Sequence, residues 1–238
     1  LNDGTHTRLS SQAFRITSTL PVVAYQFNPL DNVSVFSNDA SLLVPTSAID
    51  TTYTVVGWPQ TIANDPDHPN AETDFDHTRN DEDLRAFLTI LGTAGGTDVH
   101  VQLGSQVVRV VPLTAGAMLG PLSTVDVTLG PFDVLNLETQ GLNADFTGSV
   151  ITATQPVSVF VGSEASDAPR FADYMTRQCC ADHLEEQLLP DSVLGERFII
   201  ARTPRRTSAL NAAFIDPSLD HVAEVNEPEW IRVLATED

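Results

Sequence analysis

The chain has 238 residues, 42% of them hydrophobic, which is enough to bury the core of one large domain or two of ordinary size. Its 32 acidic and 12 basic residues give a net charge of −20. Such a charge repels nucleic acid and anionic lipid, because phosphate groups are bound through clustered cationic side chains. We therefore expect no nucleic-acid partner. No run of about twenty apolar residues occurs, so we also expect no membrane insertion.

Residues 1–62 predict the C-terminal part of a first β unit. Residues 13–18 and 22–27 have the composition of two short strands joined by a tight turn. Residues 51–58 alternate apolar and polar side chains and end at Pro59, which is typical of a strand followed by a break.

Residues 63–83 predict an exposed acidic insertion or linker, since they are rich in carboxylates and have almost nothing to bury. Calcium takes six to eight oxygen ligands and accepts carboxylates from loops. The candidate calcium ligands are Asp65, Asp67, Asp74 and Asp76, although their spacing differs from that of an EF-hand. The other interpretation is a solvated acidic loop without a cofactor.

Residues 84–165 predict a second unit, a β-sandwich of about seven short strands separated by frequent turn signals. Residues 151–160, ITATQPVSVF, resemble residues 16–25, ITSTLPVVAY. Both stretches run from a β-branched residue through a break to Pro-Val and an aromatic. We therefore expect a β-hairpin at each, and two related units in tandem.

Residues 166–197 predict a connecting segment with a short helix at 182–189, where leucines recur at helical spacing before Pro190. On this helix His183 and Gln187 lie four residues apart, and we expect them to dock the segment between β units. Residues 198–238 predict the start of a third β unit, because residues 230–238 parallel residues 87–95.

The two cysteines are adjacent, Cys179 and Cys180, which excludes a small scaffold dense in disulfides. Three interpretations remain open: a disulfide between them or with cysteines elsewhere, a pair of buried thiols, and metal binding by Cys179 with His183. No G-x-S-x-G elbow, Walker loop, HExxH or G-x-G-x-x-G motif occurs, so the sequence carries no enzyme signature.

Several blocks of sequence resemble the N-terminal domain family of the IgGFc-binding protein. They are spread over residues 14–198, and the most specific are SNDASLLVP at residues 37–45 and CADHLEEQLLP at residues 180–190. Further similarity lies at residues 24–29 and 159–162.

This resemblance implies a secreted or surface-displayed all-β module that binds other proteins or copies of itself, in adhesion or in surface or fibre assembly. It implies no enzymatic activity, and the acidic, lysine-free composition suggests a bacterial extracellular member. The alternative is a carbohydrate-binding module attached to a larger secreted protein. Because the predicted third unit is cut off at residue 238, we expect the natural product to be longer.

Overall fold

The computed structural model describes residues 7–28, 39–63, 84–105, 109–168, 181–201, 206–213 and 230–236. These residues form mainly β-strands, which confirms the predicted all-β class. The strands are β1 (Arg8–Ser10), β2 (Tyr25–Asn28), β3 (Asp39–Leu42), β4 (Asp50–Thr54), β5 (Ala86–Gly92), β6 (Thr97–Gln102), β7 (Thr124–Leu129), β8 (Val134–Glu138), β9 (Val150–Ser166) and β10 (Asp182–Gln187). A 3-10 helix, η3 (Asp191–Val193), and an α-helix, α1 (Arg206–Ala213), complete the described elements.

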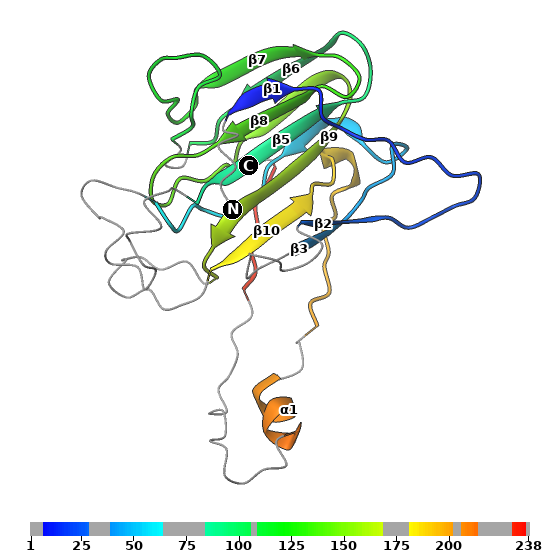
Figure 1. Cartoon of the computed structure of the whole chain (residues 1–238), viewed down its shortest axis with the longest axis vertical. Coiled ribbons are helices and arrows are strands. Elements are labelled where there is room, and N and C mark those ends of the chain that lie inside the picture. Colours follow the sequence, from blue (N-terminus) through cyan, green and yellow to red (C-terminus); the bar gives the residue numbers. More distant parts are fainter. Residues whose placement is uncertain are drawn as a thin grey trace. The chain divides into compact units, whose positions relative to one another are not determined.

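Strand β9 is the centre of an eight-stranded antiparallel sheet (Figure 1). One edge of β9 pairs first with β6 and then with β5, and its other edge pairs first with β4 and then with β10. The sheet continues outward from β5 to β8 and β1, and from β6 to β7. By changing neighbours along its length, β9 belongs to both layers of a curled, sandwich-like sheet.

The change of neighbours occurs at residues 153–156 of β9. Asp50 pairs with Val157 and Thr52 pairs with Thr152, so four residues of β9 lie opposite one residue of β4. Pro156 falls in this bulge, where its missing N–H removes no bond from a regular ladder. The predicted hairpin at 151–160 is therefore wrong: its Thr-Gln-Pro break bends one long strand instead of reversing the chain.

The hydrophobic core lies between the two layers. Alternation along the strands places one apolar set inward, as in β5, where Leu88 and Ile90 are fully buried. Strands β4, β6, β7, β8 and β9 each contribute buried side chains to the same cluster, among them Tyr53, Val101, Leu129, Leu137 and Ile151.

Strands from both sides of the acidic insertion share this core. Strand β4 comes from the predicted first unit, and it pairs with β9 of the predicted second unit. The chain divides instead into one compact unit of residues 1–194 with 234–238, and another of residues 195–233. Strands β1 and β4 from before the insertion thus belong to the same sheet as β5–β10 from after it, and not to a separate unit in tandem.

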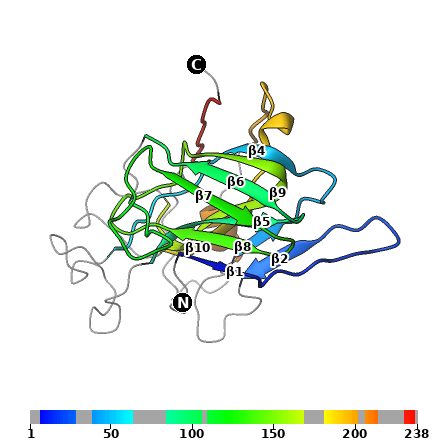
Figure 2. The same ribbon diagram turned by 90° about the horizontal axis from the view of Figure 1, so that it is seen from above.

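Residues 11–24 leave the sheet after β1 and return as β2, forming an arm (Figure 2). The predicted strand at 13–18 is not found, and the one at 22–27 is found only from Tyr25 onward, where β2 pairs with β3. A strand needs a neighbour for its backbone groups, and no described segment pairs with residues 12–23.

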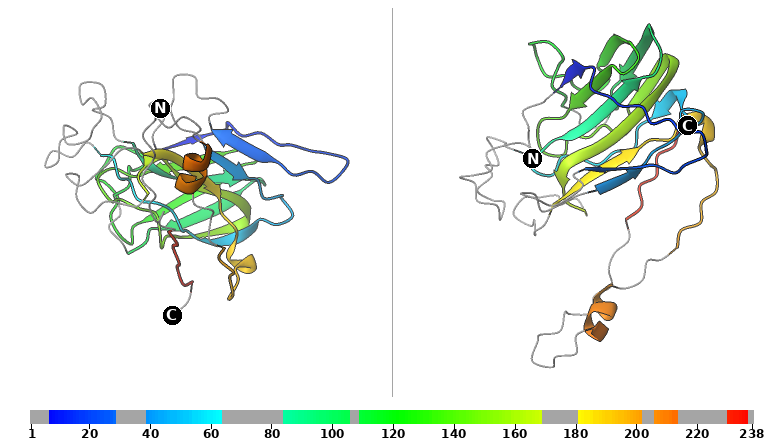
Figure 3. Two further views of the ribbon diagram at one scale, coloured as in Figure 1. Left: turned by 90° about the horizontal axis from the view of Figure 1, so that it is seen from below. Right: turned by 45° about the vertical axis from the view of Figure 1, so that its right-hand side comes forward.

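The helix predicted at 182–189 is wrong, because Asp182–Gln187 forms strand β10 (Figure 3). Its residues alternate between exposed and buried, and the buried ones are polar: His183, Glu185 and Gln187. Pairing with the open edge of β9 outweighs the helical propensity of the Leu-Glu-Glu-Gln sequence.

The second compact unit contains α1 among its described residues. Of the third β unit predicted at residues 198–238, the described residues 198–201, 206–213 and 230–236 contain no strand. No described helix combines the length and apolar character needed to cross a membrane.

Candidate functional site

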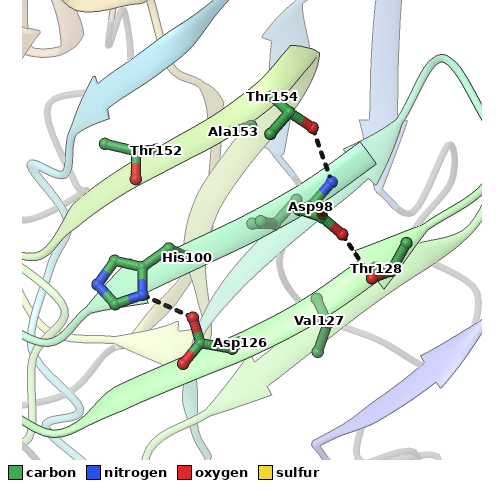
Figure 4. Close-up of a pocket in the computed structure, with 9 residues that line it drawn as sticks. Asp98, His100, Asp126, Val127, Thr128, Thr152, Ala153 and Thr154 are labelled. Carbon is green, nitrogen blue, oxygen red and sulfur yellow. Dashed lines mark hydrogen bonds and ion pairs between the residues drawn. The ribbon is translucent and has the colours of Figure 1, made fainter. Parts of the chain in front are cut away.

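An open groove of about 520 Å³ lies on the outer face of β6, β7 and β9 (Figure 4). Strict alternation along β6 turns Val99 and Val101 into the core and Asp98 and His100 outward. The groove is lined by Asp98, Val99, His100, Asp126, Val127, Thr128, Thr152, Ala153 and Thr154.

Antiparallel register brings the outward side chains of the groove into cross-strand pairs. His100 lies opposite Asp126 on β7 and opposite Thr152 on β9. The His100 Nδ1 and Asp126 Oδ1 atoms are 2.7 Å apart. Asp126, His100 and Thr152 thus form a row of polar side chains across β7, β6 and β9 (Figure 4).

A second set of bonds lies two residues along the strands. The Thr128 hydroxyl donates to Asp98 Oδ1 over 2.7 Å, and the Asp98 backbone N–H donates to Thr154 Oγ1 over 2.9 Å. These bonds fix the rotamers of the groove side chains before any partner arrives, which lowers the entropy lost on binding.

The groove side chains remain accessible although they are paired. His100 and Asp126 keep 46% and 71% of their side-chain surface exposed. A hydrogen-bonded pair this exposed adds little to stability because water competes for both groups. The imidazole, carboxylate and hydroxyl groups of the groove are therefore accessible for hydrogen bonds with a partner.

The same imidazole–carboxylate pair occurs in catalytic triads, which also need a nucleophile and an oxyanion hole. Among the described residues that line the groove, none is serine or cysteine. The described hydroxyls there belong to Thr128, Thr152 and Thr154, two of which are engaged with Asp98. The arrangement is suited to recognition by hydrogen bonds.

The residues singled out from the sequence, His183 and Gln187, lie elsewhere, where β2 and β3 cover β10 (Figure 3). His183 Nδ1 is 3.3 Å from the Glu164 carbonyl oxygen, and its Nε2 is 3.3 Å from Asn28 Nδ2. The ring also stacks on Phe87. His183 thus links β2, β9 and β10.

Side chains of β3 satisfy the outer edge of β10. The Glu185 N–H donates to Asp39 Oδ2, and the Gln187 N–H donates to the Ser41 hydroxyl, each over 2.8 Å. Gln187 Oε1 in turn accepts the Val44 N–H over 2.7 Å. This buried polar network joins the β2–β3 pair to the main sheet without a backbone ladder.

The network shifts the pKa values of two of its members. Burial lowers the pKa of His183, but the Glu185 carboxylate, the Glu164 carbonyl and the Asp39 charge outweigh burial, and the pKa is raised above its ordinary value. Burial, followed by the charges of Asp39 and Glu185, raises the pKa of Glu186. Both shifts favour the protonated form in the folded protein.

The remaining predicted site residues lie outside the described residues. These are the candidate calcium ligands Asp65, Asp67, Asp74 and Asp76, and the cysteines Cys179 and Cys180. Calcium binding, a disulfide and metal binding therefore stay predictions. The helical spacing that suggested a joint Cys179–His183 site does not hold at His183, which lies on a strand.

Sequence reasoning did not predict the groove. The alternation that turns His100 and Gln102 outward is visible in the sequence. What could not be read is that β7 and β9 flank β6, because strand order depends on long-range pairing.

Comparison with known proteins connects this fold to a binding family. The family model described as IgGFc binding protein matches residues 39–238. The human IgGFc-binding protein is 26% identical over 177 residues, which is 74% of this chain. The chain spans only 3% of the length of that relative. No solved structure matches the chain. The match over most of its length shows that the chain belongs to the IgGFc-binding protein family.

Proposed function

We propose that this chain is a non-enzymatic, extracellular protein-binding module, and that the groove on β6, β7 and β9 is its binding face. The family description and the human relative's name both refer to binding, and neither names a reaction. The role that follows is adhesion or assembly outside the cell.

The observation that carries the proposal is the row of exposed, prearranged side chains in the groove. His100 and Asp126 offer a donor and acceptors within hydrogen-bond distance of each other. Protein interfaces use such polar groups at about one hydrogen bond per 100–200 Å². Two aspartates in the lining make the groove complementary to a basic patch on a partner, so the association rate should fall with added salt.

The carbohydrate alternative requires exposed aromatic rings on a concave face. Among the described residues that line the groove there is no Trp, Tyr or Phe. The acidic, hydroxyl-rich lining therefore favours a protein ligand over a stacked sugar.

The test is binding of the 238-residue chain to three purified probes, human IgG Fc, fibronectin and collagen, with a glycan array in parallel. We expect at least one protein to bind, and the double substitution His100→Ala with Asp126→Ala to weaken that binding by about tenfold or more. The control is Asp182→Ala on β10, an exposed carboxylate outside the groove.

Each other outcome contradicts part of the proposal. Binding to glycans and to none of the proteins supports the carbohydrate-binding module instead. Protein binding that the groove substitution leaves unchanged, in a variant with a wild-type circular dichroism spectrum, places the binding face elsewhere.

A further inference from the structure

The arm at residues 11–24 exposes apolar side chains to a degree that is unusual for a folded unit. Phe14 is 95% exposed and Ile16 is 67% exposed. Leu20, Val22 and Val23 on the returning limb are also exposed. Contiguous apolar surface of this kind marks a site of association.

The β2–β3 pair adds to this apolar surface, because its polar side chains turn toward β10 and its apolar side chains turn to solvent. Gln26 and Asn28 of β2 turn toward β10, where they bond to Glu185. Tyr25 and Phe27, and Leu42 of β3, are exposed on the pair. The polar side chains bond to β10 and the apolar side chains face solvent, which is the reverse of an ordinary surface hairpin.

The outgoing limb of the arm has the pattern of a strand without a sheet. Phe14 and Ile16 alternate with Arg15 and Thr17. The Arg15 guanidinium lies 5.5 Å from the centre of the Phe132 ring, which holds the limb's polar face against the β7–β8 turn. The apolar face of the limb is left to solvent.

Strand β7 offers the matching edge. It ends the sheet and pairs only with β6 among the described strands. The Leu103 N–H bonds to the Ser123 carbonyl, so by antiparallel alternation the backbone groups of Thr124, Asp126 and Thr128 point away from β6. No described backbone group pairs with them.

We infer that residues 13–17 of one copy add as a strand along β7 of a second copy. In that arrangement Phe14 and Ile16 lie beside Val125 and Val127, which face inward or are partly covered. Arg15 lies on the outer face with Asp126. Apolar and polar positions alternate in step on both segments, as strand addition requires.

Charge favours another copy of this chain as the partner. The arm carries one charge, that of Arg15, and no carboxylate, whereas the whole chain has a net charge of −20. The arm is therefore the segment of this acidic protein that meets least repulsion at an acidic edge of another copy. The inference shares Asp126 with the groove, but the arm substitutions leave every groove residue unchanged, so they test the inference separately from the proposed function.

The first test is the mass of the full chain in solution by sedimentation over a series of concentrations. We expect a mass above the 25.7 kDa of the monomer that rises with concentration. The double substitution Phe14→Asp with Ile16→Asp should return the mass to that of the monomer. The matched control, Leu189→Asp with Val193→Asp, changes two exposed apolar residues outside the arm and should associate as the wild type does.

The second test separates arm-to-edge docking from arm-to-arm contact. The arm variant keeps an intact β7, and Asp126→Arg keeps an intact arm, so neither should associate alone while an equal mixture forms a heterodimer. Arg15→Asp alone should prevent association as Asp126→Arg does, because each places like charges opposite each other, and combining the two substitutions should restore it.

A wild type that stays at 25.7 kDa at every concentration overturns the inference. So does an arm variant that associates like the wild type, or a mixture that remains monomeric while the wild type associates. Circular dichroism spectra identical to that of the wild type show that the variants are folded.

Discussion

Residues 16–25 and residues 151–160 have nearly the same pattern of side chains and opposite environments. Ile16 is exposed on the arm, while Ile151, at the same place in the pattern, is fully buried in β9. Val22 and Val157 differ in the same way. The pattern specifies an extended chain and does not specify whether a sheet surrounds it.

Neighbours account for the difference between the two stretches. Residues 151–160 have strands on both edges, first β6 and β4, then β5 and β10. Residues 16–24 have no described strand beside them, and pairing begins only where Tyr25 meets Leu42. Burial of the same residue types therefore stabilises one stretch and leaves the other available to a partner.

The largest difference between the stretches should come from truncating their first isoleucines. Ile151→Ala opens a cavity in the core and should reduce the free energy of unfolding by about 2–5 kcal/mol. Ile16→Ala removes exposed surface and should change it by less than about 0.5 kcal/mol. Urea denaturation of both variants, at a concentration where the wild type is monomeric, measures the two values. Similar losses would contradict the exposed placement of the arm.

A smaller difference in stability is expected for substitutions two residues beyond each stretch, at Gly162 and at Phe27. A Cβ at Gly162 would collide with the Leu184 carbonyl oxygen and lie 2.6 Å from the Phe87 ring. Gly162→Ala should therefore destabilise the protein by about 1–3 kcal/mol through overpacking. Phe27, at the corresponding place after the first stretch, is half-exposed, and Phe27→Ala should cost less. Thermal denaturation of the two variants compares them, and a Gly162→Ala protein as stable as the wild type would show that β10 does not approach β9 closely.

The bulge in β9 depends on one buried hydroxyl. Tyr53 donates to the Val157 carbonyl over 2.6 Å and accepts the Asp50 N–H over 3.1 Å. Tyr53→Phe leaves both backbone groups without this partner and should cost about 1 kcal/mol in unfolding free energy. Tyr25→Phe, on the exposed side of β2, serves as the control and should be neutral in the same denaturation measurement.

The smallest predicted effect concerns the polar network that anchors β2, where the arm returns. Because the folded-state pKa of His183 is raised, its stabilisation is present below its unfolded pKa of about 6.5 and is lost as pH rises through the folded pKa. The raised pKa of Glu186 changes stability in the same direction, because the folded state binds the extra proton. Its stabilisation is present below the ordinary pKa of about 4.5 and is lost as pH rises through the folded pKa.

We therefore expect these two groups to make the protein less stable at about pH 8 than at about pH 5. Urea midpoints at the two pH values give the difference for the wild type. His183→Gln should reduce that difference, and adding Glu186→Gln should reduce it further. A difference that His183→Gln leaves unchanged would show that the His183 proton is not coupled to folding.

The sequence predicted the class of structure from local rules. Alternation at residues 97–102 and 124–129, with turn residues between strands, indicates an all-β unit whose core faces can be named in advance. The same rules misassigned β10, because its buried residues are polar and its Leu-Glu-Glu-Gln sequence favours a helix. Only the unpaired edge of β9 and the side chains of Asp39 and Ser41 make a strand favourable there.

Composition and local pattern by themselves determined that this is an acidic β protein, and the resemblance of its sequence blocks indicated the IgGFc-binding protein family. Tertiary structure alone decided which strands are neighbours, and so which polar residues meet. His100, Asp126 and Thr152 come from three strands separated by many residues, and the groove exists only because β6 lies between β7 and β9. The physical reason is that side-chain alternation is a property of each strand, whereas strand order is fixed by the burial of the whole sheet.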